Sequence, residues 1–263
     1  MFGTRLNYDC DFFVSGQRLS GIQNLDIAYS NSPVVTKPLG SRYGTTTIGG
    51  PTQQSVSLNR YFIYDDPIYD YTGNTNMSGS IEYDGISYGF QSGYLTSYSV
   101  NAAVGTVPQV NANIVVYDEM RSGYSASGNV AHPAIDVPTQ GSMSITSDWT
   151  NSNRVIGMDY SVSCNRKPYY SVGSEAPIGV AFLPPLEITA SVQYDVDEAF
   201  MASGYSFLGD GKENKTAILQ INGRDGTNLA TLSVPNASLV GETLTASSEG
   251  NLTLTQEYVG HTA

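Results

Sequence analysis

The side chains that most often carry out catalysis or bind metal ions are few in this chain and widely separated. The two histidines, His132 and His261, have no cysteine or second histidine at the spacing of a zinc site. Cys10 and Cys164 are the only cysteines, and they could form a disulfide only if the fold brought them together. We therefore expect no catalytic residues, no metal site and no cofactor. The chain is predicted not to be an enzyme.

Two charged segments need a separate interpretation. Asp195–Glu198 could attract a cation, but it lacks the glycine and the terminal glutamate of a calcium-binding loop. Gly209–Lys212 is similar to the end of a phosphate-binding loop, yet Ser206 stands where a glycine is needed and Glu213 where a serine or threonine is needed. We interpret the first segment as a charged strand end and the second as a turn.

Composition favours a β-rich protein that does not bind nucleic acid directly. The 263 residues include 27 glycines and 19 tyrosines, and only 14% are charged. Such a sequence is typical of strands and turns. The formal net charge of -12 leaves no basic stripe for phosphates. No apolar run reaches about 18 residues and no signal peptide is evident, so we expect no membrane span and folding in a reducing, cytosolic compartment.

The elements that would position these side chains recur along the chain. Gly157–Pro185 contains an alternating run, a basic turn, a second run and a loop, and Asn24–Pro51 follows the same plan. At an offset of 133 residues four identical residues coincide, namely Asp26 with Asp159, Ser30 with Ser163, Gly40 with Gly173 and Pro51 with Pro184. The pattern predicts a duplicated unit.

Further strands extend the repeat with different offsets. Ser55–Tyr64 alternates strongly, and side-chain parity favours an offset of 132, which aligns Val56 with Ile188. Ile81–Gly85 matches Leu219–Gly223 at an offset of 138. Leu252–Tyr258 is predicted to close the second copy as Val110–Tyr117 closes the first. Asp197–Gly204 is predicted to form a short helical turn.

The predicted fold is all-β, with two tandem antiparallel β-sandwich domains. We place the first domain at residues 1–119, a linker poor in large apolar residues at 120–141, and the second domain at 142–263. Gly40–Gln53 and its counterpart Ser174–Leu183 are predicted to be long exposed loops.

Three segments resemble tail tube proteins of long-tailed bacteriophages. They are Gly16–Ile22 (GQRLSGI), Leu95–Asp118 (LTSYSVNAAVGTVPQVNANIVVYD) and Val234–Gly260 (VPNASLVGETLTASSEGNLTLTQEYVG). In that family a β-sandwich domain contributes strands to a closed inner barrel, and stacked rings of subunits form the tube. Some members carry two such domains and form trimers with pseudo-sixfold symmetry. The resemblance thus implies an oligomeric β-barrel ring.

The same resemblance implies a virion tail component that is built in the host cytoplasm, contacts other phage tail proteins and lets the genome pass through its lumen. The sequence shows no clear amphipathic helix of the kind that packs on the tube domain. A tail-end, neck or baseplate ring protein therefore remains an alternative, as does a carbohydrate-binding or adhesive β-sandwich module.

Specific residues can be assigned to this arrangement. An acidic lumen would repel DNA phosphates, and the strand-borne acids Glu82, Glu187 and Asp195 are the candidates to line it. Arg166 and Lys167 in the basic turn have no basic counterpart in the first copy, where Pro33 and Val34 stand. We predict that this pair lies at an interface specific to the second domain. The two long loops are the candidates to reach a neighbouring ring.

Overall fold

The described part of the chain is built almost entirely from antiparallel strands. The structure, a computed structural model, describes residues 10–30, 33–37, 39–40, 42–48, 53–63, 66–83, 85–117, 119–128, 135–138, 140–147, 154–174, 176–198, 200, 213–246 and 252–262. Strands make up 67% of the structure. The predicted all-β class is therefore confirmed.

The strands of the N-terminal half are β1 (Cys10–Val14), β2 (Gln17–Leu19), β3 (Ile22–Ser30), β4 (Pro33–Thr36), β5 (Thr45–Ile48), β6 (Gln53–Tyr61), β7 (Met77–Tyr83), β8 (Ile86–Ala103), β9 (Gln109–Val116) and β10 (Arg121–Ser122). Those of the C-terminal half are β11 (Met143–Ser147), β12 (Val155–Ser163), β13 (Arg166–Tyr169), β14 (Gly179–Phe182), β15 (Leu186–Val196), β16 (Lys215–Asn222), β17 (Asn228–Thr245) and β18 (Leu252–Thr262). The 3₁₀ helices η2 (Tyr69–Thr72) and η3 (Gln140–Ser142) lie between strands.

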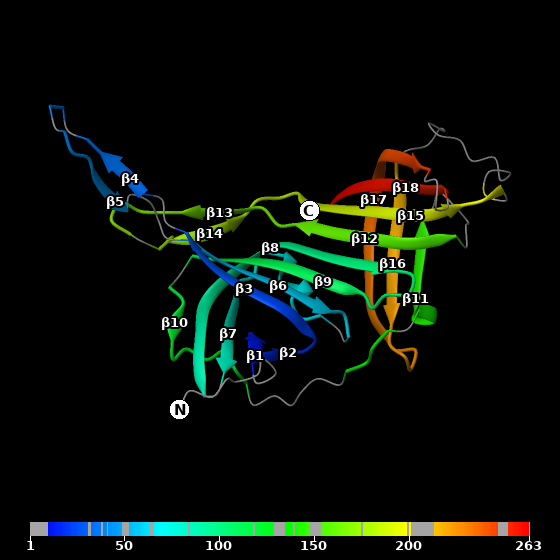
Figure 1. Ribbon diagram of the computed structural model, residues 1–263, viewed down its shortest axis with the longest axis horizontal. Coiled ribbons are helices and arrows are strands. Elements are labelled where there is room, and N and C mark those ends of the chain that lie inside the picture. The colour runs from blue at the N-terminus through cyan, green and yellow to red at the C-terminus, as the bar shows by residue number, and fades with distance from the viewer. Residues whose placement is uncertain are drawn as a thin grey trace.

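Eight of these strands form one continuous antiparallel run across the molecule (Figure 1). Their order is β3-β6-β9-β8-β12-β15-β18-β17, so each half of the chain supplies four neighbouring strands. The two groups of four meet where Ser97–Ala103 of β8 pairs with Gly157–Ser163 of β12. We call this contact the internal junction.

The pairing pattern of the first half recurs in the second, strand by strand. β1, β3, β6, β7, β8 and β9 occupy the places that β11, β12, β15, β16, β17 and β18 occupy in the second half. Even the irregularities coincide, because the extra residues Gln23 in β3 and Thr96 in β8 correspond to Ile156 in β12 and Val240 in β17. β-Bulges are specific local features, so their coincidence fixes the residue equivalence between the halves.

This register tests the offsets expected from sequence. Ile22 of β3 and Val155 of β12 begin equivalent ladders, which agrees with the offset of 133, and Met77 and Lys215 agree with the offset of 138. The offset of 132 for β6 is wrong. Ile22 pairs with Arg60 whereas Val155 pairs with Tyr194, so Val56 corresponds to Ala190 and not to Ile188. Parity alone could not detect a shift of two residues.

The long strands β8 and β17 each change partners along their length. The first part of β8 pairs with β7 and the later part with β9, and β17 divides in the same way between β16 and β18. In Figure 1 the first parts of both strands turn steeply away from the eight-strand run. A Cβ atom at Gly93 would lie 2.5 Å from the ring of Phe90, so glycine is needed where β8 turns.

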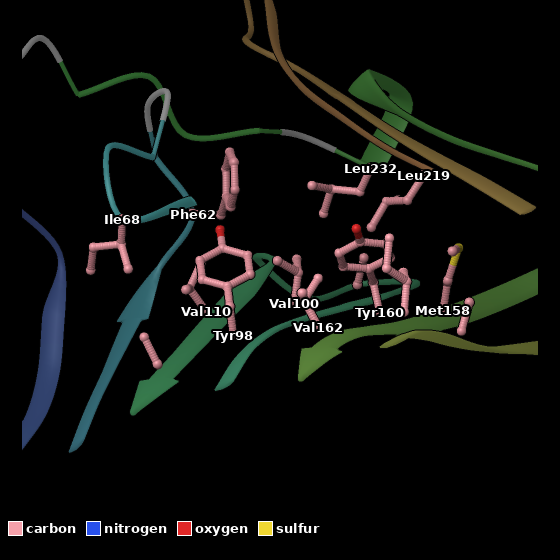
Figure 2. Close-up of a cluster of buried hydrophobic side chains, with 14 of the residues drawn as sticks. Phe62, Ile68, Tyr98, Val100, Val110, Met158, Tyr160, Val162, Leu219 and Leu232 are labelled. Atoms are coloured by element: carbon pink, nitrogen blue, oxygen red, sulfur yellow. The ribbon is translucent and has the colours of Figure 1, made fainter. Parts of the chain in front are cut away.

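One hydrophobic core lies against a single face of the run. It contains Tyr98 and Val100 of β8, and Tyr160 and Val162 of β12, all buried. In Figure 2 the rings of Tyr98 and Tyr160 rise from the run toward Phe62 on one side and toward Leu219 and Leu232 on the other. Met77 of β7 belongs to the same core as Leu219 of β16 and Leu232 of β17, so these strands and their neighbours cover this face in both halves.

The two predicted loops are hairpins instead. β5 lies within Gly40–Gln53 and pairs with β4, and β14 lies within Ser174–Leu183 and pairs with β13. The prediction missed these strands because Thr45 and Thr46 of β5 are exposed and no residue of β14 is fully buried, so neither strand shows the alternation of buried and exposed side chains on which the prediction relied. Both hairpins extend beyond the eight-strand run on the same side (Figure 1).

Two further predictions are only partly covered. Glu198 and Phe200 are helical, as expected for Asp197–Gly204, and the remainder of that segment lies outside the described residues. The predicted linker 120–141 is described at 120–128, 135–138 and 140–141. Asp136 of this segment is held to both halves, since its amide donates to Ile63 and its carboxylate accepts from the amide of Arg224 at 2.9 Å.

Candidate assembly surfaces

The face of the eight-strand run opposite the core is largely polar, with a few apolar residues such as Val115 of β9 and Val259 of β18. We call it the open face. Its side chains alternate with buried ones along each strand. They include Asp26 and Ser30 of β3, Ser57 and Asn59 of β6, Asn111 and Asn113 of β9, Ser97 and Asn101 of β8, Asp159 and Ser161 of β12, Glu187 and Asp195 of β15, Thr255 and Glu257 of β18, and Thr243 and Thr245 of β17.

The open face carries negative charge only, apart from one histidine. Its acids are Asp26, Asp159, Glu187, Asp195 and Glu257, and none of its described positions is lysine or arginine. Two of the three acids expected from sequence, Glu187 and Asp195, therefore lie on this face. A surface of this composition repels phosphate groups.

Glu82, the third candidate for an acidic lumen, does not lie on the open face. It lies in β7, which pairs with β1 and β8 outside the eight-strand run. Its carboxylate accepts hydrogen bonds from the hydroxyls of Ser80 and Ser125. Alternation along a strand reveals its two faces, but it does not reveal which sheet the strand joins.

Sequence reasoning did not assign Asp26, Asp159 or Glu257 to this surface, although a signal existed for two of them. Asp26 and Asp159 are one of the identical pairs in the repeat. A polar residue that recurs at equivalent strand positions opposite the core was the available signal.

Side-chain hydrogen bonds connect neighbouring strands across the open face. Ser57 donates to Asn113 at 2.7 Å, and Asn113 donates to Ser97 at 2.8 Å. At the internal junction the amide of Asn101 donates to the carboxylate of Asp159. The face is therefore an ordered polar surface that continues without interruption from one half of the molecule to the other.

The two ends of the run are unpaired edges within the described part of the chain. β3 pairs only with β6, and the part of β17 from Gly241 to Thr245 pairs only with β18. An unpaired edge presents free backbone N–H and C=O groups that can bind another strand. Apolar side chains lie exposed here, with Ile27 and Leu244 each 39% accessible.

Arg166 secures the internal junction from the root of the β13–β14 hairpin. Its guanidinium donates to three backbone carbonyls, those of Leu95 at 3.1 Å, Tyr71 at 3.2 Å and Gly73 at 2.5 Å. It also lies 5.2 Å from the ring centroid of Phe182 and 5.8 Å from that of Tyr94. Burial lowers the pKa of this guanidinium, which still remains charged.

Arg166 and Lys167, which were predicted to lie together at an interface, therefore have different surroundings. Arg166 contacts the first half of its own chain, so its visible function is to join the two halves. Lys167 is exposed, with its ammonium 5.6 Å from the ring centroid of Tyr169. The sequence could not show that the partners of Arg166 are carbonyls more than 70 positions away.

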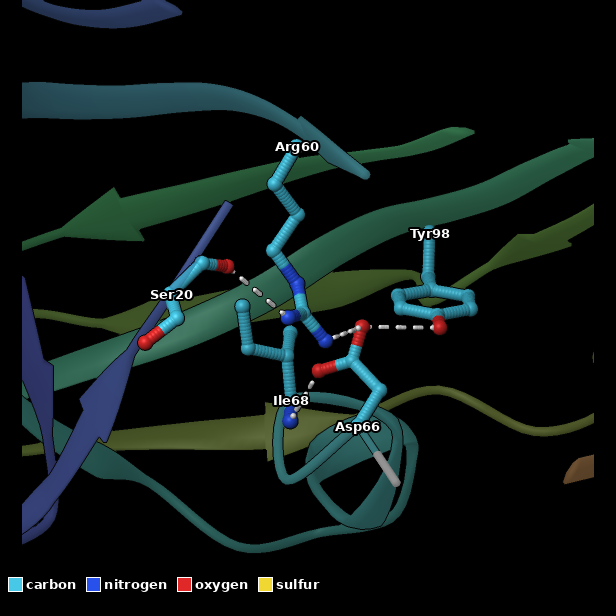
Figure 3. A network of polar contacts seen from close by, with 5 residues as sticks. All are labelled: Ser20, Arg60, Asp66, Ile68 and Tyr98. Atoms are coloured by element: carbon cyan, nitrogen blue, oxygen red, sulfur yellow. Dashed lines mark hydrogen bonds and ion pairs between the residues drawn. The ribbon is translucent and has the colours of Figure 1, made fainter. Parts of the chain in front are cut away.

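The segment that receives Arg166 is itself fixed by a buried ion pair (Figure 3). Arg60 lies 2.6 Å from a carboxylate oxygen of Asp66, and Tyr98 donates to the same oxygen at 3.0 Å. The other oxygen accepts from the amide of Ile68 at 3.0 Å, directly before η2. Burial, followed by the charge of Asp66, raises the pKa of Tyr98 well above its ordinary value.

Besides the bond from Arg166 to Tyr71, η2 touches the second half of the chain at two further points. The hydroxyls of Tyr69 and Tyr160 lie 3.1 Å apart. The thiol of Cys164 donates to the carbonyl of Thr72 at 3.4 Å, and burial raises the pKa of this thiol to about 11. Cys10 and Cys164 are both free thiols, so they are not joined.

No chemical centre emerges among the described residues. They contain no group of three or more potential metal ligands, and no helix in this part of the chain is long and apolar enough to cross a membrane. Gly85–Gly89 (GISYG) has the spacing of a serine nucleophile motif that sequence reasoning passed over. Ser87 lies in a hairpin strand and not at the strand-to-helix turn that the motif needs.

Comparison with known proteins adds no family assignment. A scan against protein-family models gives no match, and a search of curated proteins finds no similar sequence.

Proposed function

We propose that this chain is a structural subunit of a bacteriophage tail tube, with two tandem tube domains that assemble into closed rings. The observation that carries the proposal is the internal junction. Two equivalent groups of four strands are joined edge to edge there, and the outer edges of the joined pair have no partner strand among the described residues. Repetition of the same edge contact between chains would generate a larger closed sheet, in which no edge remains unpaired.

The composition of the open face supports the proposal that the ring is a channel for DNA. In a closed ring this face would line the lumen, since the opposite face is buried in the core. Its acids repel phosphates, and its serine, threonine and asparagine side chains offer no cationic site at which DNA would be retained. The role is mechanical, and the genome would slide through the lumen without specific binding.

The hairpins β4–β5 and β13–β14 support stacking of rings. Both project from the same side of the run, as Figure 1 shows, and both expose apolar side chains, including Val35 at 67%. Such groups are suited to contact with an adjacent ring. Self-assembly from three chains, giving pseudo-sixfold symmetry, and a location in the virion tail with other tail proteins follow from this proposal.

Electron microscopy of the purified protein tests the proposal. We expect rings or tubes with a central channel, and light scattering should report the mass of three chains or a multiple of it. A protein that stays monomeric at high concentration would refute ring formation. If rings form, copy number in the virion distinguishes a tube protein from an adaptor or baseplate ring, because a tube protein should be among the most abundant bands.

A further inference from the structure

We infer that β17 of one chain pairs with β3 of the next chain in the register of the internal junction, so that Leu244 lies opposite Ile27. The inference rests on the proposed ring and specifies its subunit contact. The partner is a second copy of this chain. The contact is head-to-tail, because each copy offers two different edges.

The register follows from the equivalence of the two halves. β12 corresponds to β3 through the bulges Ile156 and Gln23, and β8 corresponds to β17 through the bulges Thr96 and Val240. At the internal junction Val100 lies opposite Tyr160 and Ser99 lies opposite Ser161. Transferred to the edges, these pairs become Leu244 opposite Ile27 and Thr243 opposite Ala28.

The burial of side chains supports this assignment. Val100 and Tyr160 are 1% and 0% accessible at the internal junction, whereas their equivalents Leu244 and Ile27 are each 39% accessible. The edges thus carry apolar residues at the positions that a paired neighbour buries elsewhere in the same sheet. Burial of such groups is the main favourable contribution to protein association.

The polar face of the contact is complementary as well. At the internal junction the Asn101 amide donates to the Asp159 carboxylate. The equivalent residues are Thr245 and Asp26, so a hydroxyl donor would face a carboxylate in the same place. A shift of register by one residue would place apolar side chains on the open face and lose both matches.

The contact between chains would also differ from the internal junction in one respect. Pro33 occupies the position of Arg166 in the first half and has no side-chain donor. The cationic link to a neighbour's carbonyls is therefore missing. Only the contact within the chain has it, which gives a ring with two alternating kinds of strand junction.

Disulfide trapping tests the register. Two full-length proteins, each with Cys10→Ser, would carry either Ala28→Cys or Thr243→Cys. Directly opposed residues in antiparallel strands have Cα atoms about 4.5–5.5 Å apart, which permits a disulfide. Equal amounts of the two proteins are assembled together and oxidised mildly. About half of the protein should become dimers on a non-reducing gel, because about half of the Ala28→Cys chains have a Thr243→Cys chain at β3, and each protein alone should give none.

A register control uses Ser30→Cys mixed with Thr245→Cys, which lie on the same face but four residues out of register. At about 3.3 Å per residue they are roughly 13 Å further apart along the strands and should not crosslink. Crosslinking of this control, or of either single variant alone, would overturn the inferred contact.

Electron microscopy of the unmodified protein separates the two claims. Rings without a crosslink in the matched mixture would overturn the register while leaving the proposed function in place. A matched crosslink in a protein that forms only open filaments would support the contact and refute the closed ring. Failure of both would refute both.

Discussion

The two halves of this chain build the same strand pattern around different side chains. In the first half Arg60 of β6 pairs with Asp66, six residues further on, and both are buried. In the second half Tyr194 occupies the position of Arg60, and Phe200 follows it at the same spacing. Their rings pack with centroids 6.3 Å apart. A buried ion pair in one half thus stands where an aromatic pair stands in the other.

The two pairs show where polar chemistry is used in this fold. An aromatic pair supplies packing, but it cannot orient a backbone segment by charged hydrogen bonds. The Asp66 carboxylate holds the amide before η2, and η2 touches the second half through Tyr69 and Thr72. The ion pair therefore positions the segment that supports the internal junction.

Removal of one partner of this ion pair should have the largest effect on stability. Asp66→Ala would leave Arg60 charged and buried, and loss of one partner of a buried pair costs about 3–5 kcal/mol. Chemical denaturation of the full chain measures the change. A cost below about 1 kcal/mol would contradict the role assigned to this pair.

A second variant replaces the ion pair of the first half by the aromatic pair of the second half. The double variant Arg60→Tyr with Asp66→Phe should recover most of the stability lost in Asp66→Ala, because replacement of a buried ion pair by packed apolar groups is often neutral or stabilising. The internal junction should nevertheless weaken, since η2 loses its carboxylate anchor. Faster proteolysis near η2 is expected in this variant. Unchanged proteolysis would show that the ion pair does not support the internal junction.

The next comparison is between the internal junction and the free edges. Leu244→Lys places a charge at the edge that we expect to be buried by a neighbour, so assembly should be lost while the monomer remains folded. Ile86→Lys is the matched control, because Ile86 is an exposed strand residue away from both edges, at 65% accessibility. Light scattering and circular dichroism measure assembly and folding. Equal assembly of the two variants would argue against the edge contact.

Much of this architecture was predictable because it depends on local alternation. The all-β class and the equivalence of Asp26 with Asp159 follow from patterns within single strands. The place of Glu82 away from the open face and the two-residue error at Val56 were hidden for a common reason. Which strands become neighbours, and in which register, depends on hydrogen bonds between segments far apart in sequence. The alternation of side chains within one strand indicates neither the neighbour nor the register.

The role of Arg166 was hidden for a related reason. Its partners are the carbonyls of Leu95, Tyr71 and Gly73, and every residue has a carbonyl, so their side chains gave no signal. A sequence can suggest a charged partner for an arginine by complementarity. It cannot suggest a group of backbone acceptors that only the fold assembles.

Substitution of Arg166 should destabilise the internal junction moderately. Arg166→Ala removes charged hydrogen bonds to backbone acceptors, each worth about 1.5–3 kcal/mol when intact. Because the side chain is only half buried, we expect a total loss of about 2 kcal/mol in chemical denaturation. Lys167→Ala, one residue away and exposed, should change stability by less than about 0.5 kcal/mol. Equal effects of the two substitutions on stability would contradict the role of Arg166 at the internal junction.

Tyr98 gives the smallest effect and a distinctive pH dependence. Tyr98→Phe removes one hydrogen bond to Asp66 and should cost about 1–2 kcal/mol near neutral pH. The pKa of Tyr98 is raised in the folded protein, so above the ordinary tyrosine pKa of about 10 the unfolded chain binds fewer protons than the folded one. The stability from the neutral phenol is thus fully present below that pH and declines as the pH rises further. Denaturation from pH 8 to 12 should show a steeper alkaline loss for the native protein than for Tyr98→Phe, and parallel curves would assign the alkaline loss to other tyrosines.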